Sequence, residues 1–399
     1  MIRALLVLLL LTAAPLAAQA QQDLAALQAA AEAGDPQAQY RLAEVYRRGE
    51  GVPQNFVRAA EWYAAAADQG LPAAMNALAG LYAGGLGVPN DPARAFDLVT
   101  TAAQSGEAEY LHNLAAVTEA GIGTPADPAR AADLYAQAAA LGWADSAVAL
   151  ALLYQDGRGV PQDIPRAVEL YTAPANAGHP RAQNNLGLIL SRGEGGVEQD
   201  YAAAAEWFRR AAETGLPEAI RNLGVMYENG FGVPLDEIEA QRLYRLAALA
   251  PGQSADAEGD ATGLALLYDD RLLPPDAGRL EDYAAAASAG DPTAEFLLGY
   301  IRASAATSGA DYLEAVRLFE SAAAKGSAAA MANLGILMFE GRGALQDYVA
   351  GYMWLSLAAT SGFPGAAATR DELARRMTPD QINAANAAAE QAWADRQRD

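Results

Sequence analysis

Residues 333–362 read NLGILMFEGRGALQDYVAGYMWLSLAATSG, and their pattern indicates the fold of the whole chain. Apolar and small residues recur at helical spacing both before and after the Gly-Arg-Gly turn at 341–343. Asp347 stands where a second helix would begin, and Gly362 closes the stretch. The pattern predicts two amphipathic helices joined by a turn in which glycine adopts positive φ at little steric cost.

The closing glycine recurs along the chain at intervals of 36 residues, with one step of 37 and one slip of 75 between Gly215 and Gly290. The glycines of this series are Gly34, Gly70, Gly106, Gly142, Gly178, Gly215, Gly290, Gly326 and Gly362. Neither helix of a repeat can bury its apolar stripe alone, so the repeats must stack. We therefore expect an all-α fold, a right-handed α-solenoid of about nine repeats with a concave face and capping helices at both ends.

The slip and the chain ends set the expected domain boundaries. We expect an N-terminal capping helix at 21–33, repeats one to six at 34–250, a loop at 251–263, repeats seven to nine at 264–362, and C-terminal capping helices at 363–399. The seventh repeat is degenerate, and the eighth lacks the Gly-x-Gly joint, which predicts a longer helix or an altered turn. Thr378-Pro379-Asp380-Gln381 predicts a capping box that opens the last helix, with Glu390 and Arg396 on its outer face.

Aspartates precede most second helices and some first helices at the N-cap position, where they are structural rather than catalytic. The residues in these two columns are Asp35, Asp91, Asp127, Asp163, Asp236, Asp291, Asp311 and Asp347.

The first twenty residues, MIRALLVLLLLTAAPLAAQA, have the charge, apolar run and small-residue ending of a secretory signal peptide. We expect cleavage after Ala20 and a periplasmic or secreted protein. The apolar run is shorter than the roughly 20 residues that a membrane span requires.

Composition removes most catalytic and metal-binding chemistry. The chain has no Cys and two His, so it lacks the residues needed for thiolate catalysis, Cys-bound metals and histidine metal cages. With 27 Lys+Arg against 49 Asp+Glu, the formal net charge is −22, which disfavours nucleic acid and favours partners with basic segments. We expect no cofactor and no metal.

Two further copies of the pattern carry a family resemblance: NLGVMYENGFGVPLD at 222–236 and LALLYQDGRGVPQD at 150–163. Together with the 333–362 block they closely resemble the Sel-one-like repeat, a relative of the tetratricopeptide repeat. The resemblance covers almost all of the chain after the signal peptide. It implies a scaffold for protein–protein contacts, and bacterial relatives are often exported and tied to envelope assembly, polysaccharide export or signalling.

Analogy with tetratricopeptide grooves suggests that partners contact first-helix residues six positions after each opening glycine. The candidates are Tyr40, Asn76, His112, Asn184, Arg221 and Phe296, with Arg47, Glu119, Gln155 and Glu228 in a neighbouring column. Val148 and Ala332 occupy the first column in other repeats. The alternative is that these residues form ordinary solvated helix faces. Asn113, Asn185, Asn222 and Asn333, just before the Leu of their repeats, are expected to bond to backbone between helices.

These observations favour an exported, monomeric, non-enzymatic solenoid that docks envelope proteins in its concave face. The alternative is an envelope polysaccharide- or peptidoglycan-handling protein, for which hydrolysis would need two carboxylates facing one cleft about 5–10 Å apart. His112 and Glu119 are seven residues apart on one helix, about 10 Å by helical rise, which is too far for direct contact.

Overall fold

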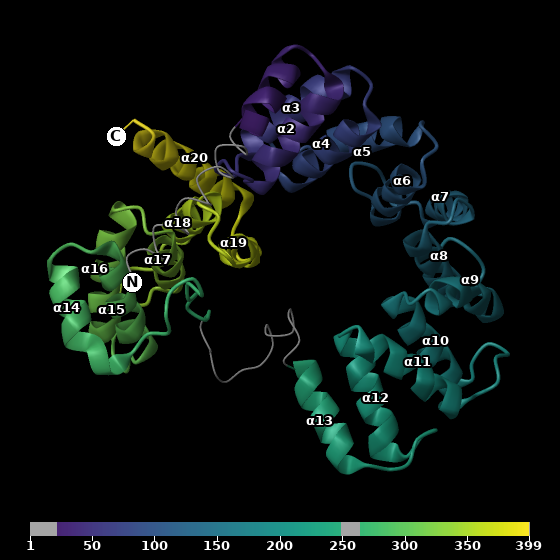
Figure 1. The fold of residues 1–399 in the computed structure, drawn as a ribbon. Helices are drawn as coiled ribbons and strands as arrows, with labels where there is room; N and C mark the ends of the chain where they lie inside the picture. Colours follow the sequence, from purple (N-terminus) through teal and green to yellow (C-terminus); the bar gives the residue numbers. More distant parts are fainter. Residues whose placement is uncertain (1–21, 249–263, 399) are drawn as a thin grey trace. The chain divides into compact units, whose positions relative to one another are not determined.

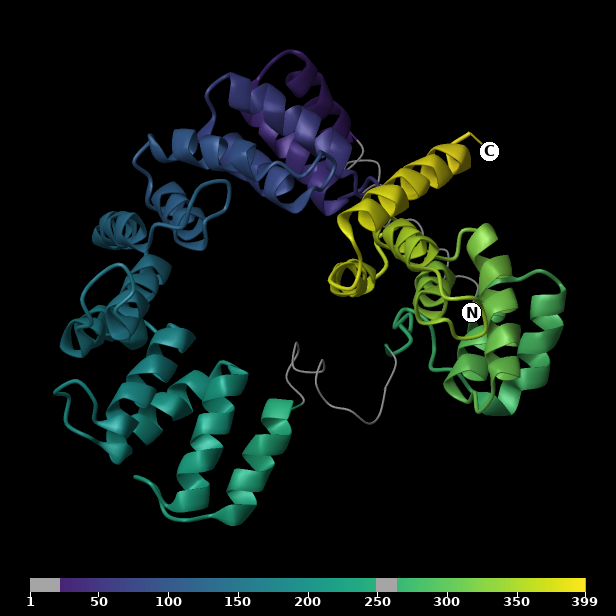
Figure 2. The same ribbon diagram turned by 180° about the vertical axis from the view of Figure 1, so that it is seen from behind.

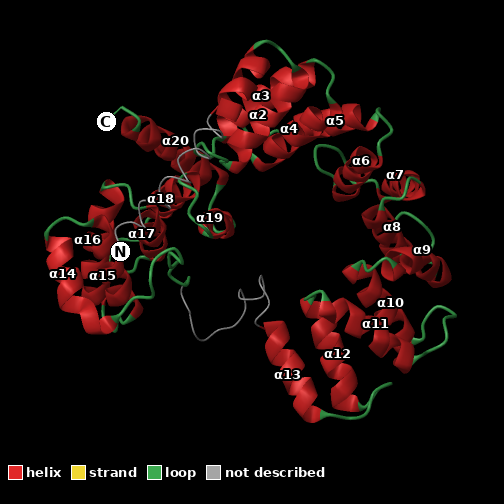
Figure 3. Ribbon diagram, viewed as in Figure 1, coloured by secondary structure: helices red, strands yellow, loops and turns green. Residues whose placement is uncertain are grey.

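The computed structural model describes residues 22–248 and 264–398, and the described secondary structure is helical throughout. Figure 3 shows helices joined by short loops, without a strand in the described residues. A helix over residues 22–32 comes first. The expected signal peptide and the expected loop at 251–263 lie outside the described residues. Helix pairs follow one another in series, which confirms the all-α solenoid of repeats.

The helices that follow are α2 (Pro36–Arg48), α3 (Phe56–Asp68), α4 (Pro72–Gly84), α5 (Pro92–Ala103), α6 (Ala108–Ala120), α7 (Pro128–Ala140), α8 (Ala144–Asp156), α9 (Ile164–Asn176), α10 (Pro180–Arg192), α11 (Tyr201–Glu213), α12 (Pro217–Asn229), α13 (Glu237–Ala248), η1 (Ala277–Arg279), α14 (Leu280–Ser288), α15 (Pro292–Ser304), α16 (Gly309–Ala324), α17 (Ala328–Glu340), α18 (Tyr348–Thr360), α19 (Ala366–Ala374) and α20 (Pro379–Arg396).

The helices form two compact units. The central unit comprises residues 92–248, with helices α5 to α13. The terminal unit comprises residues 22–91 together with 264–398, so it contains both ends of the described chain (Figure 1). A large core cluster of the terminal unit joins α15 to α20 through buried aromatic and aliphatic side chains, among them Phe319, Phe339 and Leu355.

The two glycines of the joint that follows α8 have different roles. Gly157 is the C-cap of α8 with φ +66°, a left-handed conformation that ends the helix. Gly159 also has positive φ, and a Cβ on it would lie 2.3 Å from the carbonyl carbon of Pro128 at the start of α7. The second glycine therefore lets one repeat touch the backbone of the preceding one.

Aspartate caps form as expected at most second helices. Asp127 accepts a hydrogen bond from the Arg130 backbone N–H at 3.0 Å, and Asp163 accepts from Arg166 at 2.9 Å. Asp311 is an exception. Ser308 is the N-cap of α16, and Asp311 occupies position N3 of the helix, where it completes a capping box with Ser308. This sixteen-residue helix begins earlier than its thirteen-residue counterparts such as α18, since no Gly-x-Gly joint precedes it.

The degenerate seventh repeat lacks a helix between Leu264 and Asp276, in the part of it that the structure describes. Its first described helical residues are those of η1, followed by the nine-residue α14. The eighth and ninth repeats then form complete helix pairs, α15 with α16 and α17 with α18.

The last helix, α20, opens with the expected capping box of Thr378 and Gln381. The expectation that Glu390 lies on an outer face is wrong. Its carboxylate accepts a hydrogen bond from Asn55 at 2.5 Å and pairs with Arg58 at 2.6 Å, both at the start of α3. Figure 2 shows α20 beside the first repeat from behind.

Arg396 is also directed inward, since one guanidinium nitrogen donates to the Ala323 carbonyl at 3.1 Å. The last helix of the chain therefore packs on both the first repeat and the last repeats of the terminal unit.

Candidate partner-binding surfaces

In the central unit, two pairs of successive first helices are joined by polar contacts, each of which involves one residue of the expected groove column. The Asn222 amide on α12 donates to the Asn184 side-chain oxygen on α10 at 2.9 Å, a side-chain partner rather than the expected backbone one. His112 on α6 is hydrogen bonded to Ser146 on α8 at 2.8 Å between Nδ1 and Oγ. Each of these two contacts lies between successive repeats, and we call the four residues the polar line. The line is interrupted on α8, where the column residue Val148 is apolar and only 5% exposed.

His112 is half-buried within this line. Its ring centroid lies 5.5 Å from that of Tyr135 and 6.2 Å from that of Trp143. Burial lowers the pKa of His112, and the nearby Asp145 opposes this shift. This shift favours the neutral imidazole, which acts here as a hydrogen-bonding group.

The neighbouring column connects the two helices of a repeat. Tyr135 donates its hydroxyl to Glu119 at 2.9 Å, and Glu119 also pairs with Arg158 at 2.8 Å. Equivalent bonds run from Tyr171 to Gln155 at 3.2 Å and from Tyr244 to Glu228 at 2.7 Å. In each case the tyrosine follows its partner by 16 residues, a regularity in the sequence that would have indicated this role.

In the terminal unit, the first repeat links its two helices in the same way, with a tyrosine hydroxyl that bonds to a first-helix side chain. Arg47 donates to Glu44 at 2.9 and 2.8 Å, and Tyr63 donates its hydroxyl to the same carboxylate. Burial raises the pKa of Glu44, but hydrogen bonds from Arg47 and Tyr63 and the charges of Arg47 and Arg48 lower it to about 2. The Tyr40 ring lies 5.7 Å from that of Tyr63.

The remaining candidates differ in accessibility. Arg221 on α12 is exposed, and Asn76 on α4 is half-buried. Phe296 on α15 is only 1% exposed, with its ring centroid 6.1 Å from that of Tyr268. Phe296 is therefore not open to a partner in this structure, because a segment of the same chain lies on it.

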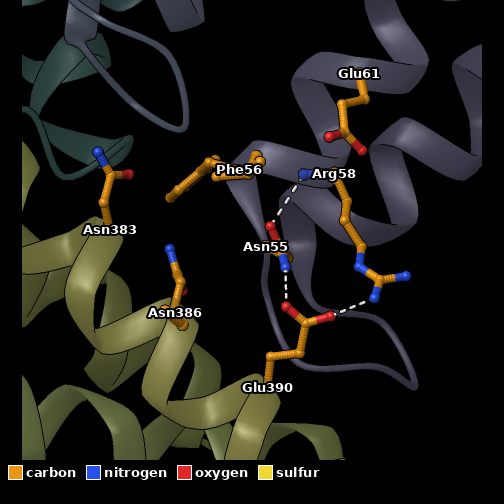
Figure 4. A pocket seen from close by; sticks show the side chains of 9 residues that line it. Asn55, Phe56, Arg58, Glu61, Asn383, Asn386 and Glu390 are labelled. Atoms are coloured by element: carbon orange, nitrogen blue, oxygen red, sulfur yellow. Dashed lines mark hydrogen bonds and ion pairs between the residues drawn. The ribbon is translucent and has the colours of Figure 1, made fainter.

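Sequence reasoning missed a pocket in the terminal unit, between the start of α3 and α20. It has a volume of about 350 Å³, and Figure 4 shows Asn55, Arg58 and Glu390 linked across one side of it. Phe56 supplies an apolar wall, and Asn386 projects from α20. The pocket exists because residues distant in sequence meet there, so no local pattern signals it.

Asn386 is 3% exposed, and neither its amide nitrogen nor its side-chain oxygen has a hydrogen-bond partner among the described residues. The neighbouring Asn383 is fully engaged, since it accepts from the Gly87 N–H at 2.9 Å and donates to the Gly85 carbonyl at 3.0 Å. Asn383 thus holds the turn of the second repeat against α20.

The profile of the Sel1 repeat matches eight segments of the chain, which are residues 36–71, 72–107, 108–143, 144–179, 180–216, 217–251, 292–327 and 328–363. The chain belongs to the Sel1 repeat family. Between the sixth and seventh matches, the described residues 264–276 are not helical.

Two solved structures are similar to this Sel1 repeat protein. One is c5321 of Escherichia coli, described as a protective antigen of uropathogenic strains with an SLR fold; it is 27% identical, with a TM-score of 0.52, and the match covers 93% of this chain and 88% of that one. The other is a Sel1 repeat protein from Oxalobacter formigenes, 28% identical with a TM-score of 0.50, covering 54% of this chain and 85% of that one. None of the curated proteins matches the chain.

The Sel1 repeats place their polar side chains in pairs and lines. Residues 22–248 and 264–398 contain no group of three or more His, Asp or Glu side chains arranged to hold a metal ion. Across the same ranges, no helix combines the length and hydrophobicity of a membrane span. The polar groups of these contacts are amides, hydroxyls and carboxylates that bond to one another within the chain.

Proposed function

We propose that this protein is an exported, non-catalytic scaffold that binds protein partners with basic segments along the first helices of its central unit. The observation that best supports this is the inter-repeat polar line, in which Asn184 meets Asn222 and His112 meets Ser146. Side-chain amides on adjacent first helices, here Asn184 and Asn222, are groups that can hydrogen bond to an extended partner chain, which is a common basis of peptide recognition.

Charge supports the choice of partner. The chain has a formal net charge of −22, and the exposed Glu228 lies on α12 beside this polar line. Long-range attraction of a basic segment raises its association rate and falls as salt screens it. The signal-peptide pattern at 1–20 supports an envelope location for the partner.

The test is affinity capture from an envelope extract with residues 21–399 and two variants. The surface variant combines Asn222→Ala with Glu228→Lys, both on α12. The control variant is Glu213→Lys, the same charge reversal at an exposed position on the second helix α11. We expect the parent and the control to retain the same protein, and the surface variant to retain at least about tenfold less.

Captured protein should also elute more readily as salt rises, because the contact is charge-assisted. Equal capture by the parent and a folded surface variant would refute the location of the site. If the parent captures nothing specific at low or moderate salt, the scaffold proposal itself fails.

A further inference from the structure

The segment Leu264–Tyr268 of the terminal unit has the sequence LALLY, which is also the sequence of residues 150–154. Residues 150–154 lie within helix α8, whereas residues 264–268 are not helical. Figure 1 shows this segment as the green coil that follows the grey trace and runs beside α17. The seventh repeat thus places a non-helical segment on a first helix, where the same five residues in another repeat form part of a helix.

Side chains of α17 and its following turn bind the backbone of this segment. Asn333 is fully buried; its amide donates to the Leu267 carbonyl at 2.7 Å, and its oxygen accepts from the Leu267 N–H at 2.9 Å. The Glu340 carboxylate accepts from the Leu264 N–H, and Arg342 donates to the Leu264 carbonyl at 2.8 Å. We call Asn333, Glu340 and Arg342 the α17 site.

These four bonds go to the N–H and C=O groups of Leu264 and Leu267, so the α17 site recognises peptide backbone rather than a particular side chain. The Asn333 amide pairs with both backbone groups of one residue, as a neighbouring β-strand would. Helices cannot offer both groups in this way, because their N–H and C=O are already bonded within the helix.

The side chains of the segment meet apolar surface. Leu264, Leu266, Leu267 and Tyr268 pack against the core cluster of the terminal unit. The Tyr268 ring centroid lies 5.1 Å from that of Tyr300 on α15. The segment therefore contacts two successive first helices with its backbone fixed and its leucines and tyrosine partly buried.

We infer that the first-helix face of α15 and α17 is a binding site for extended, leucine-rich peptide, and that Leu264–Tyr268 is its occupant in cis. This rests on the proposed function in taking a protein segment as the ligand, and it names the chemistry of that segment. A partner segment with two or three leucines and a terminal aromatic residue competes for the same backbone bonds of Asn333.

Tethering determines how the competition must be measured. A segment held in the same chain is present at an effective concentration of the order of millimolar, so a free peptide binds weakly until the occupant is removed. Replacing Leu264, Leu267 and Tyr268 by Ser removes three of the four occupant side chains that pack on the core cluster and leaves the α17 site unchanged.

The experiment uses fluorescence anisotropy with a labelled synthetic peptide LALLYDD, the sequence of residues 264–270. We expect the triple Ser variant of the full chain to bind it at least about tenfold more tightly than the parent. Adding Asn333→Ala to that variant should weaken binding by at least about tenfold. A peptide N-methylated at the fourth residue, which corresponds to Leu267, loses the donor to Asn333 and should bind similarly weakly.

A folded triple variant that does not bind the peptide, or one that binds it equally well with Asn333→Ala or with the N-methylated peptide, overturns the inference. Should the triple variant fail to fold, Tyr268→Ala removes one ring only and is titrated in its place, with the same outcomes decisive. Capture of a partner through α12 is independent of this titration. A negative peptide result beside successful capture therefore refutes this site and leaves the proposed function standing.

Discussion

Replacing the second glycine of a joint should cost more stability than replacing the glycine that closes a repeat. Gly159 and Gly142 both lie in the central unit and both have positive φ, +70° and +90°. A Cβ on Gly142 would have no heavy atom within 4 Å, whereas one on Gly159 would lie 2.3 Å from the Pro128 carbonyl carbon and 2.5 Å from the Ala129 nitrogen. Gly142→Ala thus isolates the backbone cost, and Gly159→Ala adds an inter-repeat clash.

The magnitudes follow from these distances. An alanine in the left-handed region costs about 1–2 kcal/mol, and this applies to both variants. Nonbonded carbons prefer about 3.5–4.0 Å, so α7 must move by more than about 1 Å to accept the added methyl group in the Gly159→Ala variant. Overpacking of this kind costs a further 1–3 kcal/mol, roughly. We expect Gly142→Ala to lose about 1–2 kcal/mol and Gly159→Ala about 2–5 kcal/mol.

The assay is urea unfolding followed by circular dichroism, with hydrogen exchange of the α7 amides as a local measure. Local exchange matters because repeat arrays do not always unfold as one cooperative system. Gly157→Ala is a second control, since its Cβ would meet the Gln162 Cβ at 3.2 Å and no closer atom. Equal unfolding midpoints for Gly159→Ala and Gly142→Ala, with equal exchange in α7, would refute the close-approach role of the second glycine.

Three further outcomes test individual side chains. The folded pKa of Glu44 is about 2, below its ordinary value of 4.5, so the stability that its carboxylate contributes is present above about pH 4.5 and is lost as pH falls towards 2. Glu44→Gln should therefore flatten the acid dependence of the urea midpoint, and an unchanged dependence would show that Arg47 does not stabilise the carboxylate. Burial lowers the folded pKa of His112, so the unfolded chain takes up the proton first and stability falls as pH drops below about 6.5. NMR titration should give an imidazole pKa below 6.5, and a value above it contradicts the burial argument. Tyr352 donates its hydroxyl to Gln54 across the terminal unit, so Tyr352→Phe should cost about 1–2 kcal/mol in thermal or urea unfolding, and a loss within error of zero would show that the bond contributes nothing net.

The repeat architecture was predictable because its signals are local. A helix boundary depends on which residue can cap it and which can adopt positive φ, and both properties belong to single residues such as Asp127 and Gly157. Periodicity of the small and apolar positions adds the stacking requirement. Hence the sequence predicts the helix pairs, most aspartate caps and the Thr378 capping box, and the structure agrees.

The exposure of the candidate side chains was less predictable, because it depends on which other elements of the chain cover them. Phe296 occupies the same column as Arg221, yet only Arg221 is exposed. Glu390 has the sequence features of a solvated outer helix face, but it binds Asn55 and Arg58 because both chain ends belong to one compact unit. Contacts between residues as far apart as the 335 positions that separate Asn55 from Glu390 leave no periodic signal.

The two LALLY segments show which features follow from local sequence and which depend on tertiary packing. By itself the sequence determined the repeats, because the residues around 150–154 continue the helical pattern and end it with a glycine joint. Five residues cannot decide a helix, since nucleation is costly and a short helix depends on its packing. That residues 264–268 are not helical follows from tertiary contacts, because Asn333, Glu340 and Arg342 bind backbone groups of this segment that would otherwise bond within a helix.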